Sequence, residues 1–296
     1  MDTGDLRTAL AEWQRHMQAE HLSWHTVDSY VRGVGYYLDW CGERPPLDRR
    51  TLDGWVAHLL ATGAQPATAR IRQQAVRRFS AWLADEDIID DDPFPGMRPP
   101  RLDVKVVQSL SEDELRLLLK ACAGRALRDR RDEAILRLFV DTGMRARELL
   151  ALNLTDLDQS RGLVTVRKGK GGKGRVVAFG ARTGVALDRY LRVRRGHKLA
   201  ATPALWLTET GGGDRLGYHG LRVGLLGRAQ AAGVDGFHIH KLRHTFATRW
   251  LAKEGSEGGL MAAAGWSRRD MIDRYTAATA SERAAAEAQR LNLGDL

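Results

Sequence analysis

Apolar residues recur at spacings of three and four through the first 90 residues, which is the period of an amphipathic helix. In the opening segment, Leu6, Leu10 and Trp13 fall on one helical face, and Val27 and Val34 do so in the next. The pattern therefore predicts four N-terminal helices, at residues 5–17, 23–41, 51–63 and 68–86.

A proline-rich stretch then interrupts the helical pattern and predicts an extended linker, because proline cannot continue a helix. Beyond it, Ser111 is followed three residues later by Glu114, a spacing typical of a capping box at a helix start. A further helical pattern breaks at Thr142-Gly143 and restarts. The chain is thus expected to divide into a helical domain, a linker and a second domain, at residues 1–92, 93–108 and 109–296.

A β-hairpin is predicted in the second domain. Val164 and Val166 alternate with polar residues on one side of a Gly/Lys-rich turn, and Val177 and Phe179 do so on the other. The rest of the domain has a helical pattern, with helices predicted at 181–196, 218–232, 238–253 and 259–275 and a tail helix at 281–292. The expected fold class is therefore mainly α with one small β-hairpin or sheet (α+β).

Charge is unevenly distributed along the chain, whose net charge is +9. Residues 1–100 hold 11 arginines against 15 acidic residues, whereas residues 101–296 hold 35 basic against 22 acidic residues. A basic second domain favours a polyanionic partner, nucleic acid above all. Cys41 and Cys122 match no disulfide or metal spacing, which favours a reducing cytoplasm. The sequence shows no signal-peptide pattern and no apolar run near the ~20 residues that cross a bilayer.

The segment HIHKLRHTFATRW, residues 238–250, concentrates positive and titratable side chains on one predicted helix. His240 and Arg243 share a face at a spacing of three. One interpretation is a basic surface stripe over a core. A second is a metal site of His240, His244 and His238, but this segment lacks the glutamate of H-E-x-x-H. A third is a phosphate clamp, which needs partners elsewhere in the chain.

Candidate partners lie in four other motifs. Arg145 follows the Thr-Gly break at a helix start, where a guanidinium and a helix N-terminus together favour an anion. Glu148, three residues on, is placed to orient Arg145 or a histidine. Trp266 follows a glycine, and Tyr275 comes nine residues later. The hairpin turn adds three lysines: Lys168, Lys170 and Lys173.

Taken in order, these motifs resemble the tyrosine recombinase family, which includes phage integrases and Xer-type recombinases. The set is T-G-x-R-x-x-E-L, a G-K-G hairpin, H-x-L-R-H, G-W-S and R-Y-T, spread over roughly residues 108–280. Each motif is weak alone, but five in order at compatible spacings are specific. The N-terminal helices resemble the family's four-helix, SAM-like core-binding domain. The resemblance implies that the two domains clamp DNA.

The resemblance also implies roles for individual residues. Arg145 and Arg243 are the two catalytic arginines, and His240 is the catalytic histidine. Tyr275 is the nucleophile. Matching on G-K-G selects Lys170 as the catalytic lysine, with Lys173 as the fallback because the hairpin is one residue longer than usual. The remaining implied site positions are Trp266, where the family has His or Trp, and the supporting residues Glu148 and His244.

Phosphodiester cleavage without a metal needs these residue types. Two guanidiniums can stabilise the extra negative charge of a phosphorane-like transition state, the task that a metal ion performs elsewhere. A tyrosine nucleophile stores the bond energy as a 3′-phosphotyrosyl ester, so neither ATP nor another cofactor is expected. Because a free tyrosine has a pKa of ~10, it needs a base or strongly positive surroundings, and His240 is the candidate proton acceptor or orienter. A hairpin lysine would protonate the leaving 5′-oxygen. Trp266 can donate one hydrogen bond but cannot transfer a proton.

The fourth helix suggests how DNA is held. Arg70, Arg77 and Arg78 share one face of it, with apolar residues opposite, which suits a helix docked on phosphates. A solvated charged face is an equal alternative. Lys168 and Lys173 are further candidate DNA contacts on the hairpin.

The resulting hypothesis is a site-specific recombinase acting on double-stranded DNA in the bacterial cytoplasm, at the nucleoid. About twenty residues precede the second helix, so no arm-binding domain is expected. The ending that runs from G-W-S to R-Y-T-A, and the lack of a Xer-like match in the N-terminal half, favour a phage-type integrase over a Xer-type resolvase. The resemblance implies a dimer on a core site and a tetramer in the synaptic complex, with a directionality factor or host protein as a further candidate partner. The alternatives are a type IB topoisomerase, a binding-only relic and a metallonuclease.

Overall fold

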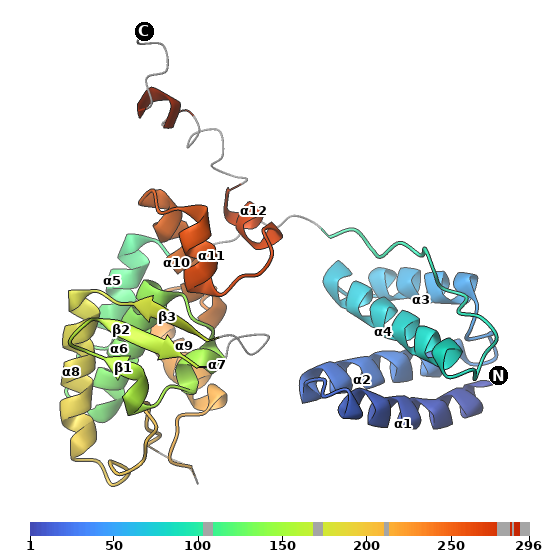
Figure 1. Ribbon diagram of the computed structural model, residues 1–296, viewed down its shortest axis with the longest axis horizontal. Coiled ribbons are helices and arrows are strands. Elements are labelled where there is room, and N and C mark those ends of the chain that lie inside the picture. Colours follow the sequence, from blue (N-terminus) through green and yellow to red (C-terminus); the bar gives the residue numbers. More distant parts are fainter. Residues whose placement is uncertain (103–108, 168–173, 210–212, 277–284, 286, 291–296) are drawn as a thin grey trace. The chain divides into compact units, whose positions relative to one another are not determined.

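The computed structural model describes residues 1–102, 109–167, 174–209, 213–276, 285 and 287–290. Two compact units make up the chain, Met1–Val104 and Lys105–Leu296. Figure 1 shows the helices of the first unit in blue and cyan and the mixed second unit in green to red. Each unit has its own hydrophobic core and is described by itself.

The four helices predicted for the N-terminal unit are all present. They are α1 (Thr3–Ala19), α2 (Trp24–Cys41), α3 (Arg49–Ala61) and α4 (Pro66–Asp85). Side chains of Asp2, Ser23 and Asp48 cap the first three, and proline opens the fourth, where its missing N–H costs nothing. The apolar faces meet in a core rich in aromatic rings, which include Trp13, Tyr37, Trp55 and Phe79.

The start of the expected 93–108 linker belongs instead to the N-terminal core. Phe94 is fully buried in that core and Met97 nearly so. Arg77 donates a hydrogen bond to the Met97 carbonyl at 3.0 Å, and Arg49 donates to the carbonyl of Pro95. Proline content correctly indicated that this segment is not helical. Proline content did not predict the packing of Phe94. Burial of the phenylalanine side chain stabilises the fold by more than the loss of conformational entropy in the segment costs.

The C-terminal unit is mainly helical around a small sheet. Its first helices are α5 (Glu112–Lys120), α6 (Leu127–Thr142) and α7 (Ala146–Leu150), followed by the 3₁₀ turn η1 (Leu154–Asp156). After the strands come α8 (Ala181–Arg195), α9 (Tyr218–Ala231), α10 (Ile239–Ala252), α11 (Glu257–Ala264) and α12 (Asp270–Thr276). The predicted capping box at Ser111 and Glu114 is confirmed, with bonds of 3.1 and 2.7 Å.

The predicted hairpin is confirmed as two strands of a three-stranded antiparallel sheet in the order β1-β2-β3. Strand β2 (Leu163–Val166) pairs with β3 (Arg175–Ala178), and the two-residue β1 (Leu157–Asp158) is too short to leave a pattern in the sequence. Val164, Val166 and Val177 are buried as predicted, whereas Phe179 lies just past the strand. The turn lysines, Lys168, Lys170 and Lys173, lie outside the described residues.

The single helix expected at 259–275 is wrong, because the chain folds there into two helices, α11 and α12. Gly265 ends α11 with φ +64°, a left-handed conformation that stops the hydrogen-bond ladder and that glycine adopts without steric cost. The break turns the chain between Trp266 and Tyr275. Most of the expected tail helix, 281–292, lies outside the described residues.

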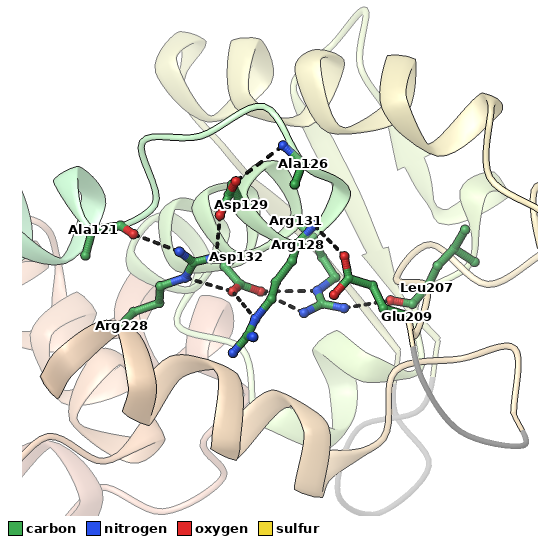
Figure 2. Close-up of polar contacts among 9 residues, drawn as sticks. All are labelled: Ala121, Ala126, Arg128, Asp129, Arg131, Asp132, Leu207, Glu209 and Arg228. Carbon is green, nitrogen blue, oxygen red and sulfur yellow. Dashed lines mark hydrogen bonds and ion pairs between the residues drawn. The ribbon is translucent and has the colours of Figure 1, made fainter. Parts of the chain in front are cut away.

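A buried ionic network joins α6 to α9 and to the segment before it (Figure 2). Asp132 accepts hydrogen bonds from Arg131 at 3.0 Å and from Arg228 at 3.0 Å. Arg228 also donates to Asp129 at 2.8 Å, and Arg131 to the Leu207 carbonyl at 2.9 Å. These bonds satisfy polar groups that burial would otherwise leave costly, and they fix helices that are distant in sequence.

Candidate active site

The site begins at the glycine turn between α6 and α7. Gly143 ends α6 with φ +56°, and a Cβ there would lie 2.1 Å from the Phe246 ring, so only glycine fits. This close approach lets the Gly143 carbonyl accept a hydrogen bond from Arg243 of α10 at 2.6 Å. The Thr-Gly motif thus joins the segment that carries Arg145 to the helix that carries Arg243.

Arg145 caps α7 and is held by Glu148. Its backbone N–H donates to Glu148 at 2.8 Å and its Nη1 at 2.9 Å, and its side chain is one-third exposed. The predicted orienting role of Glu148 therefore matches its contacts. The expected contribution of a helix N-terminus does not hold, because α7 has five residues and the Arg145 amide is already bonded to Glu148. Anion binding here rests on the guanidinium itself.

Arg243 is almost fully buried, at 3% exposure. Its Nη2 donates to the Ala264 carbonyl at 2.6 Å, and its guanidinium lies 5.3 Å from the centre of the Trp266 ring. Burial, followed by the nearby charge of Arg145, lowers the pKa of Arg243 to about 10. The guanidinium therefore stays protonated at neutral pH, in surroundings where its charge is weakly screened.

Three arginines donate to three consecutive carbonyls at the end of α11. Arg243 reaches Ala264, Arg145 reaches Gly265 at 3.1 Å, and Arg175 reaches Ala263 at 2.8 Å. Because α11 leads directly into Trp266, these bonds tie the arginines to the segment that ends in Tyr275.

Arg175, on β3, is a residue that the motifs did not identify. Both of its terminal nitrogens bond Glu148, at 3.1 and 2.7 Å. A signal was present in the sequence: Arg175 shares the inward side of β3 with the buried Val177, two residues on. A charged residue at such a position needs a buried partner.

Tyr275 is half-buried against Trp266 and α10. Its ring stacks on Trp266 with centroids 5.4 Å apart, and its hydroxyl is bonded to Nδ1 of His244. Trp266 is buried, and its Nε1 has no hydrogen-bond partner among the described residues. A buried N–H donor on a ring that faces the Arg243 guanidinium is suited to a phosphate oxygen.

The histidines are arranged differently from expectation. His244, rather than His240, contacts the Tyr275 hydroxyl, and His240 lies edge-to-face on His244 with ring centroids 4.4 Å apart. Partial burial, then the charge of Arg243, lowers the pKa of His240 below its ordinary 6.5, although the residue stays accessible to solvent. His240 is therefore neutral at pH 7 and able to accept a proton.

The metal interpretation of this segment has no geometric support. His238 caps α10, and its Nδ1 accepts a hydrogen bond from the Lys241 amide at 3.2 Å. Within the part of the chain that the structure describes, no three His, Cys, Asp or Glu residues are grouped to hold a metal ion.

Other tyrosines are placed for packing. Tyr37 and Tyr190 are fully buried, and their hydroxyls donate to the carbonyls of Pro46 and Leu205. Burial raises the pKa of both, the opposite of what a nucleophile needs. Tyr30 stacks on Trp13 in the N-terminal unit.

The candidate DNA-binding arginines of α4 are not equivalent. Arg70 and Arg78 are exposed, and the Arg78 guanidinium lies 5.8 Å from the centre of the Tyr30 ring. Arg77 is half-buried and donates to the Met97 carbonyl, so it supports the fold of its own unit. Gln74, which the motifs did not identify, is exposed beside them on the same hollow of α4.

The chain belongs to the phage integrase family, whose model matches residues 108–282. It is a tyrosine recombinase, an enzyme that cleaves and rejoins DNA at specific sites. Among individual proteins it is 32% identical to tyrosine recombinase XerC of Pseudomonas fluorescens over 246 residues, 80% of each chain. It is 31% identical to XerC of Xanthomonas campestris pv. campestris (strain B100) over 275 residues, covering 91% of this chain and 84% of that one.

The fold is also that of solved recombinases. XerH site-specific recombinase, in a post-cleavage complex with palindromic difH substrate, superposes with a TM-score of 0.74 at 19% identity, covering 95% of this chain and 84% of XerH. The expected mainly helical fold, with a helical N-terminal domain and a recombinase catalytic domain, is confirmed. No helix in the described ranges is both long and apolar enough to cross a membrane.

Proposed function

We propose that Tyr275 is the nucleophile of this recombinase and that Arg145 and Arg243 bind the phosphate it attacks. The observation that carries the proposal is the pair of arginines tied to the α11 carbonyls that lead into Trp266 and Tyr275. The tyrosine oxygen forms a bond to phosphorus, and the bond from phosphorus to the 5′-oxygen breaks. The product is a 3′-phosphotyrosyl ester, later reversed by a DNA 5′-hydroxyl without metal, ATP or other cofactor.

The donors of the site stabilise the transition state. Arg145 and Arg243 neutralise charge on the non-bridging oxygens, and the unpaired N–H of Trp266 donates to one of them. Lys170, with Lys173 as the fallback, protonates the leaving 5′-oxygen.

The proton of Tyr275 passes to an imidazole of α10. His240 is assigned as the acceptor on bound DNA by its place in the H-x-L-R-H motif, where it lies against His244, and its lowered pKa keeps it neutral at pH 7. His244 positions the hydroxyl, as its bond to Tyr275 indicates. His240→Gln should slow cleavage at neutral pH and remove the acid limb of the pH–rate profile, which lies below the ordinary imidazole pKa of 6.5, whereas His244→Gln should slow cleavage and keep that limb. The reverse pattern would exchange the two roles.

DNA is held by basic side chains of both units, of which Arg70 and Arg78 are exposed. In the N-terminal unit we assign phosphate contacts to Arg70 and Arg78, and in the hairpin to Lys168 and Lys173. Arg77 is assigned no phosphate contact; it stabilises the N-terminal unit through its hydrogen bond to the Met97 carbonyl. Both units contact a core DNA site in the bacterial cytoplasm, where a dimer occupies one site, a tetramer joins two, and a directionality or host factor is a further partner.

The test is covalent trapping in EDTA. Labelled DNA from in and around the gene is incubated with wild type or Tyr275→Phe and run on SDS gels. The expected result is an SDS-resistant, protease-sensitive adduct with wild type alone, confined to one short fragment. Adducts on every duplex would indicate a type IB topoisomerase. No adduct, with both proteins still shifting one fragment on a native gel, would indicate binding without catalysis. Cleavage that EDTA abolishes would indicate a metallonuclease.

Two recombinase roles remain to be separated. The sequence favours a phage-type integrase, whereas similarity to XerC supports a Xer-type role. A plasmid with two directly repeated copies of the cleaved fragment tests resolution, and two different sites on separate molecules test integration. Recombination of unlike sites supports the phage type, and resolution of identical repeats alone supports the Xer type.

A further inference from the structure

All three nitrogens of the Arg175 guanidinium bind the protein. Nε bonds the Ala263 carbonyl, and Nη1 and Nη2 form a two-point contact with Glu148. The side chain is only 11% exposed. Such a fork fixes both the distance and the plane of the carboxylate, which a lysine cannot do. Arg175 is therefore built to hold Glu148 rather than to meet a ligand.

Glu148 in turn connects Arg175 to the phosphate-binding arginine. One of its oxygens accepts from Nη1 of both Arg145 and Arg175, and the other accepts from the Arg145 amide and from Arg175 Nη2. The carboxylate is 5% exposed, so few solvent bonds could replace a lost partner. Losing Arg175 would leave Glu148 half-satisfied and free to rotate, and Arg145 would move with it.

We propose that Arg175 is a positioning residue for DNA cleavage: it fixes Glu148, and through it Arg145, while tying both to the end of α11 that leads to Trp266 and Tyr275. This inference rests on the proposed function of Arg145 and Tyr275. Arg175 itself touches neither phosphate nor nucleophile in this scheme. Its contribution is to hold Arg145 at a fixed position relative to the segment that carries Trp266 and Tyr275.

The experiment separates cleavage from binding and from folding. Single-turnover rates of adduct formation, at saturating protein on a nicked substrate that traps the adduct, are compared for wild type, Arg175→Met and Arg175→Lys. Affinity for the same DNA is measured by native gel shift, and the folded fraction by circular dichroism. Because misplacing a reacting group by ~1 Å costs about 100-fold, we expect rates 10- to 100-fold lower for both variants at unchanged affinity.

A structural arginine of the same unit supplies the matched control. Arg228 is largely buried and, like Arg175, bonds carboxylates and a backbone carbonyl, here Asp129, Asp132 and Ala121 (Figure 2). Arg228→Met should lower the unfolding temperature, while the folded protein cleaves at the wild-type rate. Arg175→Met should instead lower the cleavage rate of the folded protein more than it lowers the unfolding temperature.

A double-mutant cycle tests whether Arg175 acts through Glu148. If it does, Arg175→Met changes the rate by less than about twofold in a Glu148→Gln background. Independent, multiplying effects would overturn the proposal, as would wild-type rates in both Arg175 variants or a loss confined to DNA affinity. If Arg175→Met does not fold, Arg175→Lys carries the same test. Absence of an adduct with wild type would instead count against the nucleophile assignment.

Discussion

The C-terminal unit holds two clusters of buried or partly buried arginines that differ in how their charge is matched. In the network of Figure 2, Arg131 and Arg228 face Asp129 and Asp132, with Glu209 accepting from the Arg128 amide alongside. In the candidate active site, Glu148 is the one carboxylate in the described part of the chain that pairs with an arginine of the cluster, and its partners are Arg145 and Arg175. Arg243 bonds the carbonyls of Gly143 and Ala264 instead.

The difference in charge matching indicates which of the two clusters favours binding of an anion. Matched charges satisfy one another, so the first cluster gains nothing from a ligand and serves to fix helices. The second cluster has more guanidinium groups than carboxylates. Its arginines donate hydrogen bonds to backbone carbonyls, which carry only a partial negative charge. In the proposed function, the DNA phosphate supplies the missing negative charge.

The largest expected effect comes from removing a cation of the unmatched cluster. Arg243→Met should slow adduct formation by about 1,000-fold, because one transition-state donor is lost at the phosphate. Its effect on the unfolding free energy should be small, since a buried cation of lowered pKa is removed together with its desolvation cost. Single-turnover trapping and urea denaturation measure the two quantities. A rate within tenfold of wild type would contradict the assignment.

Removing an anion of the matched cluster should do the reverse. Asp132→Ala leaves Arg131 and Arg228 without a shared buried partner, and breaking such a pair typically costs about 3–5 kcal/mol. The cleavage rate per folded molecule should stay at the wild-type value. Urea denaturation gives the loss of stability, and trapping at a temperature where the variant is folded gives the rate. A stable variant that cleaves slowly would erase the distinction between the clusters.

The carboxylate of the unmatched cluster should show a clear pH dependence. Burial opposes ionisation of Glu148, but hydrogen bonds from Arg175 and Arg145 outweigh it, so the pKa lies below its ordinary 4.5. A group of depressed pKa stabilises the fold above its unfolded pKa and loses that contribution as pH falls. The difference in unfolding free energy between wild type and Glu148→Gln should therefore be full above about pH 4.5 and shrink below it. Denaturation across that range tests this, and a constant difference would contradict it.

The smallest effect is expected at the rim of the matched cluster. The Arg128 side chain is 47% exposed and lies 3.7 Å from Asp132, so solvent screens the pair. Arg128→Ala should cost less than about 1 kcal/mol and leave cleavage unchanged. The same denaturation series measures it. A cost as large as that of Asp132→Ala would show that the network depends on all its members equally.

Much of the fold was predictable because its signals are local. Helical spacing, the caps at Ser111 and Thr142-Gly143, and the alternation around the hairpin each depend on neighbours within a few residues. Two predictions failed, one at a local signal that the apolar pattern hid and one at a contact between segments distant in sequence. Gly265 ends α11, although the apolar pattern of the sequence continues past it. Phe94 packs into the N-terminal core, which the proline-rich sequence around it does not indicate.

The sequence by itself determined the family, most of the helices and the order of the motifs that carry Arg145, His240, Arg243 and Tyr275. Tertiary structure decided which partners these residues have. Arg175 meets Glu148 across 27 positions and Ala263 across 88, and His244 rather than His240 meets Tyr275. The physical reason is that periodicity shows which side chains share a face, whereas pairing depends on which buried polar groups the folded chain brings within hydrogen-bond distance.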